Sequence, residues 1–388
     1  MPMDFPSSPT VGQQYNGYVW TGTAWDSTSA QPIALTTVAT ADNYVINGGM
    51  EIAQRGTGAF TGSGSYPVDR FYIEYSTGTF TTQQIADGPA GVSPYSLRAT
   101  VTSVGTRLAA DYFQIVHNLE GSQVSGLGFG AAGARTITVS FYVKSSVTGT
   151  FSGTLSSGAN TRAYGFTYTI NAANTWEREI ITIPGDVVGG TTEYPITNVT
   201  GLRLRLSLGN GTNYNVATAN SWVAETNKTS VAGSVGWAQT AGATFQLSGV
   251  QIEQGSTATA FRRNAPSIQA ELAACQRYFY NPVNEVTVAF TAFANAVTYS
   301  ANAARVTIEL PVTMRTVPSI SGITVGDFWL GYGNIGNNFQ ATGMQIDPST
   351  RNHLQLTVTT GGGMTNNISC QLYRPSATTG IFPISAEL

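Results

Sequence analysis

Short segments in which apolar and polar side chains alternate are the feature that most constrains the fold of this chain. In the segment 135–144, Ile137, Val139, Phe141 and Val143 share one face of an extended strand, and polar residues take the other. The segment 202–208 repeats the pattern, with four leucines on one face and Arg203 and Arg205 on the other. Similar segments, bounded by Gly, Ser and Asn clusters, recur from residue 44 to 261 and again after residue 281. The sequence therefore predicts an all-β protein.

The segment 245–253 predicts an irregularity in its strand. Phe245 and Leu247 alternate with polar neighbours, but Ser248 and Gly249 shift the alternation, so that it continues at Val250 and Ile252. An extra residue in a strand shifts its faces in this way, and glycine is common at such points. We expect a β-bulge at Gly249.

One segment has helical periodicity. Between residues 266 and 279, Ile268, Leu272, Cys275 and Phe279 fall at positions i, i+4, i+7 and i+11, which predicts an amphipathic helix. Its apolar stripe requires a partner, and the sequence leaves two options open. Three copies of the chain can bury their stripes on a common axis, which makes Ile268 and Leu272 subunit contacts, or the helix packs on its own β domain.

Composition excludes several classes of protein. Only 10% of the residues are charged, against about a quarter in an average protein, and the net charge is −3. No basic surface is expected, so nucleic-acid binding is not predicted.

No apolar run approaches the roughly 20 residues of a membrane span, and the first residues lack a signal-peptide pattern, so we expect folding in a cytoplasm without membrane insertion. Cys275 and Cys370 are the only cysteines and are expected to be reduced core residues.

An aromatic cluster marks the N-terminal segment. Tyr15, Tyr18, Trp20 and Trp25 surround a Thr-Gly-Thr turn, which predicts a small hairpin in an extended arm. An arm of this length does not bury a core by itself, so its rings are expected to contact another surface. That surface is either an attachment partner or another copy, or the neighbouring domain of the same chain.

Three segments resemble a known family. Residues 47–56 (NGGMEIAQRG) and 245–253 (FQLSGVQIE) are similar to the opening and closing strands of jelly-roll carbohydrate-binding modules in bacteriophage tail-fibre and other virion-appendage proteins. Residues 271–278 (ELAACQRY) resemble the helix that joins such a module to a distal β domain. The resemblance implies four parts: an N-terminal attachment arm (1–44), a jelly-roll β-sandwich (45–263), a short linker helix (264–280) and a second, smaller distal β-sandwich (281–388).

The resemblance also implies a function. It predicts a structural protein of the virion, assembled in the host cytoplasm, that forms a tail fibre or a similar appendage and attaches the particle to host surface glycan. A homotrimer is expected, with other virion proteins bound through the N-terminal arm. Two alternatives stay open: a head, collar or neck decoration with a purely architectural role, and a polysaccharide depolymerase.

Two further expectations come from the family. Related modules often hold a structural calcium ion, and Glu51 matches the first ligand position, but Ser248 and Gly249 stand where other members carry acids. No cofactor is therefore predicted beyond this optional ion. Asp69 and Arg70 also recur in the family, and we expect this pair to fix a loop by charge-assisted hydrogen bonds.

Residues for catalysis are sparse. Glu177 and Glu179 form the best carboxylate pair, but they alternate on one face of a predicted strand, where solvated charges are expected. His117 and His353 are the only histidines and neither has a nucleophile motif beside it. His117 is expected on the polar face of its strand. The sequence predicts that the protein is not an enzyme.

Sugar binding requires aromatic rings beside amide and hydroxyl groups, because a pyranose has an apolar face and a polar rim. Trp176, Tyr214, Trp222 and Trp237 are the candidate ligand-binding residues, although aromatic rings in such a chain more often belong to a core. The stretch 209–243 holds three of them among many Asn, Thr and Ser residues. It is predicted to be an exposed loop for ligand binding or subunit contact.

Overall fold

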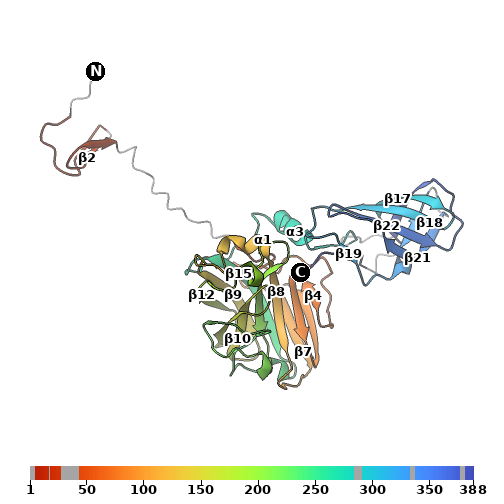
Figure 1. Cartoon of the computed structure of the whole chain (residues 1–388), viewed down its shortest axis with the longest axis horizontal. Helices are drawn as coiled ribbons and strands as arrows, with labels where there is room; N and C mark the ends of the chain where they lie inside the picture. The colour runs from red at the N-terminus through yellow and green to blue at the C-terminus, as the bar shows by residue number, and fades with distance from the viewer. Residues whose placement is uncertain (1–4, 17, 28–42, 284–290, 333–336, 376–380) are drawn as a thin grey trace. The chain divides into compact units, whose positions relative to one another are not determined.

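The computed structural model of the chain describes residues 5–16, 18–27, 43–283, 291–332, 337–375 and 381–388. Strands dominate these ranges, and the few helices are short (Figure 1). The predicted all-β fold class is confirmed. The chain divides into two compact units, Met1–Asp42 and Asn43–Leu388.

The N-terminal unit contains a three-stranded antiparallel sheet with the order β1-β2-β3. Its strands are β1 (Gln14–Tyr15), β2 (Tyr18–Trp20) and β3 (Trp25–Ser27). The predicted hairpin is present, with Trp20 opposite Trp25 and their ring centroids 5.7 Å apart. The ring of Phe5 stacks on Trp25 at 5.1 Å, and Tyr15 and Tyr18 also contact Phe5. The rings therefore pack partly on one another, and their contact with a further surface stays a prediction.

The second unit begins with a β-sandwich of two antiparallel sheets, as predicted for the jelly roll. The larger sheet has seven strands in the order β14 (Trp222–Val223), β11 (Ala163–Ile170), β10 (Gly149–Ser157), β13 (Thr200–Ser207), β8 (Phe113–Glu120), β5 (Phe71–Tyr75) and β4 (Ser65–Val68). The smaller sheet has five strands in the order β12 (Glu177–Ile183), β9 (Ile137–Ser145), β15 (Thr244–Gln254), β7 (Ser96–Ser103) and β6 (Thr79–Ile85). The inward faces of both sheets form one hydrophobic core.

Alternation decides which side chains enter this core. Ile137, Val139, Phe141 and Val143 of β9 are fully buried in it, as their spacing predicts. The predicted bulge in β15 is confirmed, because the pairing with β9 shifts between Ser248 and Gln251. Gly249 supplies the conformation that the bulge needs, with φ = 61°, which a residue with a Cβ rarely adopts.

The predicted helix is α3 (Ile268–Gln276), which begins after the N-cap Ser267. Cys275 is buried and Leu272 half-buried in a small cluster with Ile46 and Ile52 at the start of the jelly roll, whereas Ile268 is 38% exposed. The helix therefore packs on its own β domain over most of its stripe. Both cysteines are buried and free.

The distal part of the second unit differs from the predicted β-sandwich. Six strands close into a barrel in the order β17 (Thr291–Ser300), β18 (Ala303–Glu309), β22 (His353–Thr360), β21 (Asn338–Ile346), β20 (Trp329–Gly331) and β23 (Ser369–Arg374). A three-stranded sheet of β16 (Phe279–Tyr280), β24 (Ile384–Ser385) and β19 (Ser319–Ile320) accompanies it. An alternating strand buries one face in either arrangement, so the sequence pattern does not distinguish a closed sheet from two facing sheets.

The remaining helical elements are single turns within loops. They are α1 (Gly121–Val124), η2 (Ser125–Leu127), α2 (Gly190–Glu193), η3 (Thr212–Tyr214), η4 (Trp237–Gln239) and η5 (Val325–Asp327). Among the described residues, no helix has the length and apolar character needed to cross a membrane.

Charged side chains connect the jelly roll to the residues that follow it. Asp69 accepts hydrogen bonds from the backbone and side chain of Gln54, and Arg70 forms an ion pair with Glu387. The prediction that Asp69 and Arg70 fix local structure is therefore confirmed. Arg277, just after α3, donates to both carboxylate oxygens of Glu120 at 3.0 and 2.6 Å.

Candidate functional site

The predicted binding loop, residues 209–243, lies against its own sheet. The Val231 N–H donates to Ser152 Oγ at 3.1 Å, and Thr154 Oγ1 donates to the Lys228 carbonyl at 3.3 Å. Ser152 and Thr154 point outward from β10, and both are fully buried. The loop therefore covers the outer face of this strand, and Ser and Thr side chains of the strand bond to the loop backbone.

The four aromatic residues predicted to bind ligand are not brought together. None of the ring contacts found in the described part of the chain joins two of them. Trp237 is 1% exposed in the core between Phe80 and Phe245, so it offers no ring face to a ligand, and its prediction is wrong. Trp237 is the first residue of the turn η4, and the sequence pattern did not indicate this turn.

The other three rings are partly buried. Trp222 packs on Phe129, Tyr164 and Tyr194, and its indole nitrogen donates to the Pro184 carbonyl at 2.7 Å, so its ring closes one end of the sandwich. Tyr214 lies beside Tyr112 with ring centroids 5.6 Å apart. Trp176 is half-buried, and Lys144 Nζ lies 5.8 Å from its ring centroid.

The geometry around Glu51 does not fit a calcium ion. Both of its carboxylate oxygens accept hydrogen bonds from the Arg263 guanidinium, so a side chain supplies the positive charge beside Glu51. Within the described ranges, no group of three or more His, Cys, Asp or Glu side chains is arranged to hold a metal ion. Glu51 therefore belongs to a side-chain ion pair.

Glu177 and Glu179, the acidic pair on β12, have different surroundings, which shift their pKa values in opposite directions. Glu177 accepts hydrogen bonds from the Asn171 and Ala172 N–H groups; burial raises its pKa, but these bonds outweigh burial and the pKa is lowered. The pKa of Glu179 is raised, by burial first and then by the charge of Glu177. Glu177 thus holds a turn of the backbone, and neither residue forms an ion pair among the described residues.

His117 corrects a second expectation. It lies opposite Leu204 on the inner face of the larger sheet, is 2% exposed, and its ring centroid is 4.5 Å from that of Phe71. Burial lowers its pKa well below the usual value, and the nearby Arg70 charge lowers it further. The polar-face prediction is therefore wrong: His117 is a neutral core residue. His353, the other histidine, is half-buried with Nδ1 3.0 Å from Thr350 Oγ1.

A polar surface that sequence reasoning only partly identified lies on the outer face of the seven-stranded sheet. Because Leu204 and Leu206 point inward from β13, Arg203 and Arg205 point outward. The register places Arg203 opposite Asn118 on β8, and the neighbouring strand β5 contributes side chains on the same face. The six residues of this surface, which we call the arginine face, are Tyr72, Glu74, Gln114, Asn118, Arg203 and Arg205.

Hydrogen bonds fix most of these side chains. Gln114 Nε2 donates to Glu74 Oε2 at 2.8 Å, and Asn118 Nδ2 donates to the Tyr72 hydroxyl at 3.2 Å. Arg203 Nη2 donates to the Gly158 carbonyl at 3.2 Å. The face thus combines a phenol ring, two amides, a carboxylate and two guanidinium groups in a fixed arrangement.

The six side chains of the arginine face differ in how far they are buried. Arg205, Gln114 and Asn118 are 5%, 5% and 2% exposed, whereas Tyr72, Glu74 and Arg203 are half-buried and remain accessible. Burial raises the pKa of Tyr72, and the Glu74 charge raises it further, so its hydroxyl stays protonated at neutral pH. A half-buried ring beside hydrogen-bonding groups is an arrangement that can bind one face and the rim of a sugar.

Sequence reasoning missed part of this face for a physical reason. The alternation of 202–208 did assign Arg203 and Arg205 to the polar side of their strand. Tyr72, Gln114 and Asn118 come from strands that are far away in the sequence, and only the register of β5 and β8 places them beside the arginines. Strand order, which one sequence does not reveal, was the missing information.

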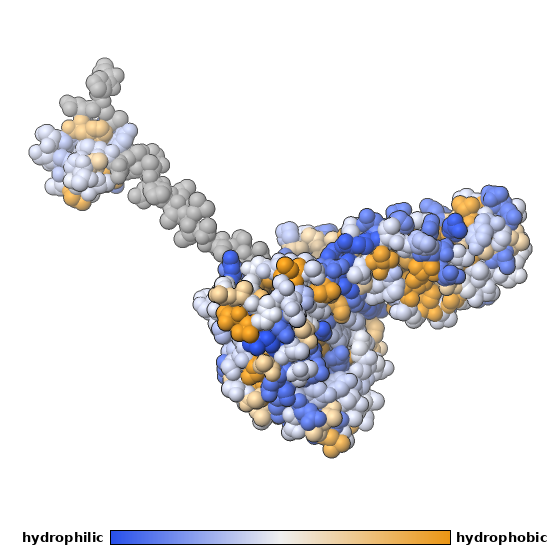
Figure 2. All heavy atoms as spheres, viewed as in Figure 1, coloured by the Kyte–Doolittle hydropathy of each residue, from blue (hydrophilic) through white to orange (hydrophobic). Residues whose placement is uncertain are grey.

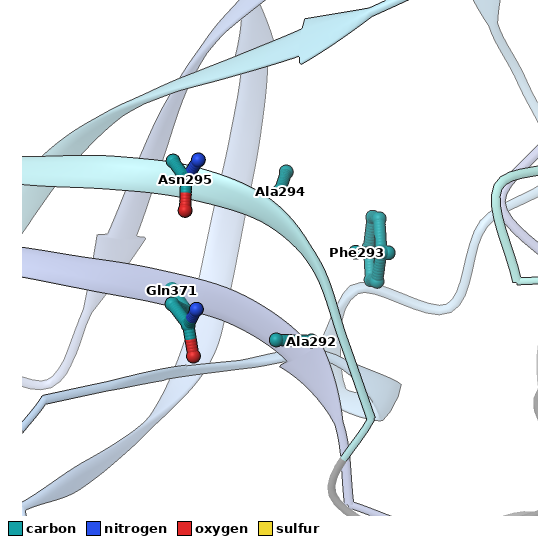
Figure 3. Close-up of a pocket in the computed structure, with 5 residues that line it drawn as sticks. All are labelled: Ala292, Phe293, Ala294, Asn295 and Gln371. Atoms are coloured by element: carbon teal, nitrogen blue, oxygen red, sulfur yellow. The ribbon is translucent and has the colours of Figure 1, made fainter.

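A pocket lies on the barrel. An open pocket of about 250 Å³ is lined by Ala292, Phe293, Ala294, Asn295 and Gln371. Figure 3 shows Asn295 and Gln371 side by side on β17 and β23, where they are register partners. The pocket is below the roughly 300 Å³ at which small-molecule sites usually begin, so we do not assign a ligand to it.

Comparison with known proteins was made by sequence and by structure. The sequence matches no protein family and no curated protein. One similar solved structure is the enzymatically active domain of tailspike protein 4 of bacteriophage CBA120, at 12% identity and a TM-score of 0.32; the match covers 55% of this chain and 22% of that chain.

Two other similar structures are carbohydrate-binding modules. One is TmCBM61 in complex with β-1,4-galactotriose, with 11% identity, a TM-score of 0.28, and coverage of 55% of this chain and 99% of that one. The other is a family 11 module from Clostridium thermocellum, with 12% identity, a TM-score of 0.25, and coverage of 51% and 96%. All three TM-scores are below 0.5, so the fold described above depends on the strand order of this chain alone.

Proposed function

We propose that this chain is a non-enzymatic structural protein of a phage virion, a tail-fibre or similar receptor-binding appendage, whose jelly roll binds host surface glycan on the arginine face. The observation that carries the glycan-binding part is the half-buried Tyr72 ring, which shares the outer face with Gln114 and Asn118 on the adjacent strand β8 and with Arg203 on the strand beyond it. Ring, amide and guanidinium groups are the side chains that recognise a sugar.

The support for a virion role is the arrangement of the segments that resemble tail-fibre proteins. The Asn47 N–H donates to the Glu271 carboxylate, and Gln54 Nε2 donates to the Phe279 carbonyl at 2.8 Å. The opening segment of the jelly roll and the helix segment therefore form one joint, although more than 200 residues separate them. This joint is the part of the molecule that the family resemblance covers.

Substitution of Tyr72 tests glycan binding. We expect Tyr72→Ala in the full chain to weaken binding to an array of bacterial surface polysaccharides by about tenfold or more, because a ring contact in a binding site typically contributes over 1 kcal/mol. Tyr142→Ala is the matched control, since Tyr142 is a half-buried tyrosine on the outer face of the smaller sheet. Equal binding by the two variants would remove the arginine face from the proposal.

Attachment through the N-terminal unit needs a separate test. The rings of Phe5, Trp20 and Trp25 pack on one another within this unit. We expect Trp25→Ala to reduce incorporation of the chain into virions, measured by quantitative immunoblotting of purified particles. Normal incorporation of the variant would show that another part of the chain makes the attachment.

The same proposal includes a homotrimer, to which the exposed Ile268 is available. Light scattering during size-exclusion chromatography measures the oligomer directly, and a stable monomer at micromolar concentration would remove the trimer. Labelled electron microscopy of virions distinguishes a tail appendage from a head, collar or neck decoration. Release of new reducing ends from host polysaccharide would instead identify a depolymerase.

A further inference from the structure

Arg205 carries a buried charge that has no ion-pair partner among the described residues, although the Glu74 charge acts on it from the same face. Its side chain is 5% exposed, and Nη1 donates to Ser156 Oγ at 2.8 Å and to Asn160 Oδ1 at 2.9 Å, both neutral acceptors. Its Nε is buried without a hydrogen-bond partner. No ion pair among the described residues includes Arg205 or Arg203.

Two other arginines of this chain are paired with carboxylates. Arg70, 2% exposed, pairs with Glu387, and Arg162, whose side chain is 13% exposed, pairs with Asp186. A guanidinium stays charged at any physiological pH, and burying a charge without a counter-charge is costly. Arg205 thus differs from these two arginines, because its hydrogen-bond acceptors on Ser156 and Asn160 are neutral.

The surroundings of Arg205 add to the positive charge. Arg203 lies two residues away on the same face and is half-buried. Glu74 is the acid of the arginine face, and its carboxylate already accepts a hydrogen bond from Gln114. Two guanidinium groups and one side-chain carboxylate therefore lie on this face, and Asn118 also donates to the Leu388 oxygen at 3.1 Å.

We propose that the arginine face binds an anionic substituent of a glycan, a carboxylate or a phosphate group. This inference rests on the proposed function and names the chemical class of its ligand. The accessible Arg203 contacts the anion directly, Arg205 below it supplies the balancing charge, and the Tyr72 ring contacts the sugar that carries the substituent. Guanidinium groups suit this role, because their planar donors match the oxygens of carboxylates and phosphates.

The experiment uses the full chain on an array of neutral, uronic-acid-bearing and phosphate-bearing bacterial polysaccharides. We expect the bound glycans to be acidic. Methyl esterification, which neutralises carboxylates, is expected to abolish binding to uronic acids, and phosphatase treatment to abolish binding to phosphate esters. The two treatments identify which anion is recognised. Binding should also weaken as salt rises from 0.05 to 0.5 M, because the screening length shortens about threefold.

Variants assign the effect to the two arginines. We expect Arg203→Gln to weaken binding of acidic glycans by about tenfold or more, the loss of at least one charge-assisted hydrogen bond. Arg135→Gln is the control, because Arg135 lies at the end of the other sheet and bonds to Gln254. Arg205→Lys keeps the charge and Arg205→Gln removes it. We therefore expect Arg205→Gln to bind acidic glycans more weakly and Arg205→Lys to bind them as the unaltered protein does. Thermal melting of each variant separates lost binding from lost folding.

The outcomes separate this inference from the proposed function. Binding that is restricted to neutral glycans, or that is equal in the protein and Arg203→Gln, would overturn the anion while leaving glycan binding in place. Failure to bind any polysaccharide on the array would reject glycan binding itself, and this inference with it. Acidic binding that disappears in Arg203→Gln and persists in Arg135→Gln would support both.

Discussion

The guanidinium carbon of Arg70 lies 3.6 Å from the centre of the Tyr278 ring. Arg70 belongs to the loop between β4 and β5, and Tyr278 follows α3, so this contact joins the jelly roll to the residues after the helix. The Tyr278 hydroxyl in turn donates to Glu120 Oε2 at 2.7 Å. A charged and buried joint of this kind has measurable consequences for stability.

The first prediction concerns the pH dependence of this joint. Burial raises the pKa of Glu120, but hydrogen bonds from Arg277, Ser122 and Tyr278 outweigh burial and lower it to about 2, against an ordinary 4.5. A carboxyl group with a lowered pKa stabilises the folded state above pH 4.5, and this contribution is lost as the pH falls toward 2. We expect Glu120→Gln to cost about 3 kcal/mol at pH 7 and much less at pH 3.

Urea denaturation of both proteins across this pH range measures the difference. Asp69, whose pKa is raised to about 6 chiefly by burial, is present in both proteins and cancels in the comparison. Asp87→Asn is the control, because its pair with Lys144 is exposed and worth about 0–1 kcal/mol. A cost for Glu120→Gln that does not change with pH would contradict the ion-pair explanation.

A second prediction concerns the bulge in β15. Gly249 has φ = 61°, and a Cβ there would lie 2.8 Å from the side chains of Tyr142 and Val92. Gly242 has a similar φ of 69° but open space around the same position. We expect Gly242→Ala to cost about 1 kcal/mol from backbone strain, and Gly249→Ala to cost a further 1–3 kcal/mol from the clash. Thermal denaturation of both variants measures the two costs. Equal destabilisation by Gly242→Ala and Gly249→Ala would mean that Tyr142 and Val92 move aside and that no clash occurs.

A third prediction separates the core from the proposed binding surface. Trp237 is fully buried, so Trp237→Ala is expected to destabilise the fold by about 3–5 kcal/mol. Its affinity for glycan, measured well below its melting temperature, should equal that of the unaltered protein. The opposite profile, normal stability with weaker binding, is expected of Arg203→Gln. Weaker glycan binding by the folded Trp237→Ala variant would contradict this prediction and would indicate that Trp237 contacts the ligand.

A fourth prediction concerns calcium. Since Arg263 occupies both carboxylate oxygens of Glu51, we expect 5 mM chelator to leave the melting temperature unchanged, within about 1 °C. Arg263→Ser removes the partner of Glu51 at a site whose arginine is 40% exposed, and should cost about 1 kcal/mol. A drop of several degrees on adding the chelator would show that a metal ion stabilises this protein after all.

Alternation of side chains was sufficient to predict the strands and their buried faces. It identified β9, β13 and β15, the bulge at Gly249, and the outward direction of Arg203, because these properties depend only on neighbours within one extended segment. The helix α3 followed in the same way from its 3.6-residue periodicity. These are local properties of the chain, and the amino-acid sequence determined them by itself.

Tertiary structure decided what lies across the strands. Only the order of β5, β8 and β13 brings Tyr72, Asn118 and Arg203 onto one face, and only the closure of the distal sheet makes it a barrel. His117 lies in the core because its position in β8 points inward, although its side chain is polar. Trp237 lies in the core because the path of its loop places it there, although the surrounding sequence is typical of an exposed loop. Pairings between distant strands depend on register and on the closure of long loops, and neither leaves a local signal in a single sequence.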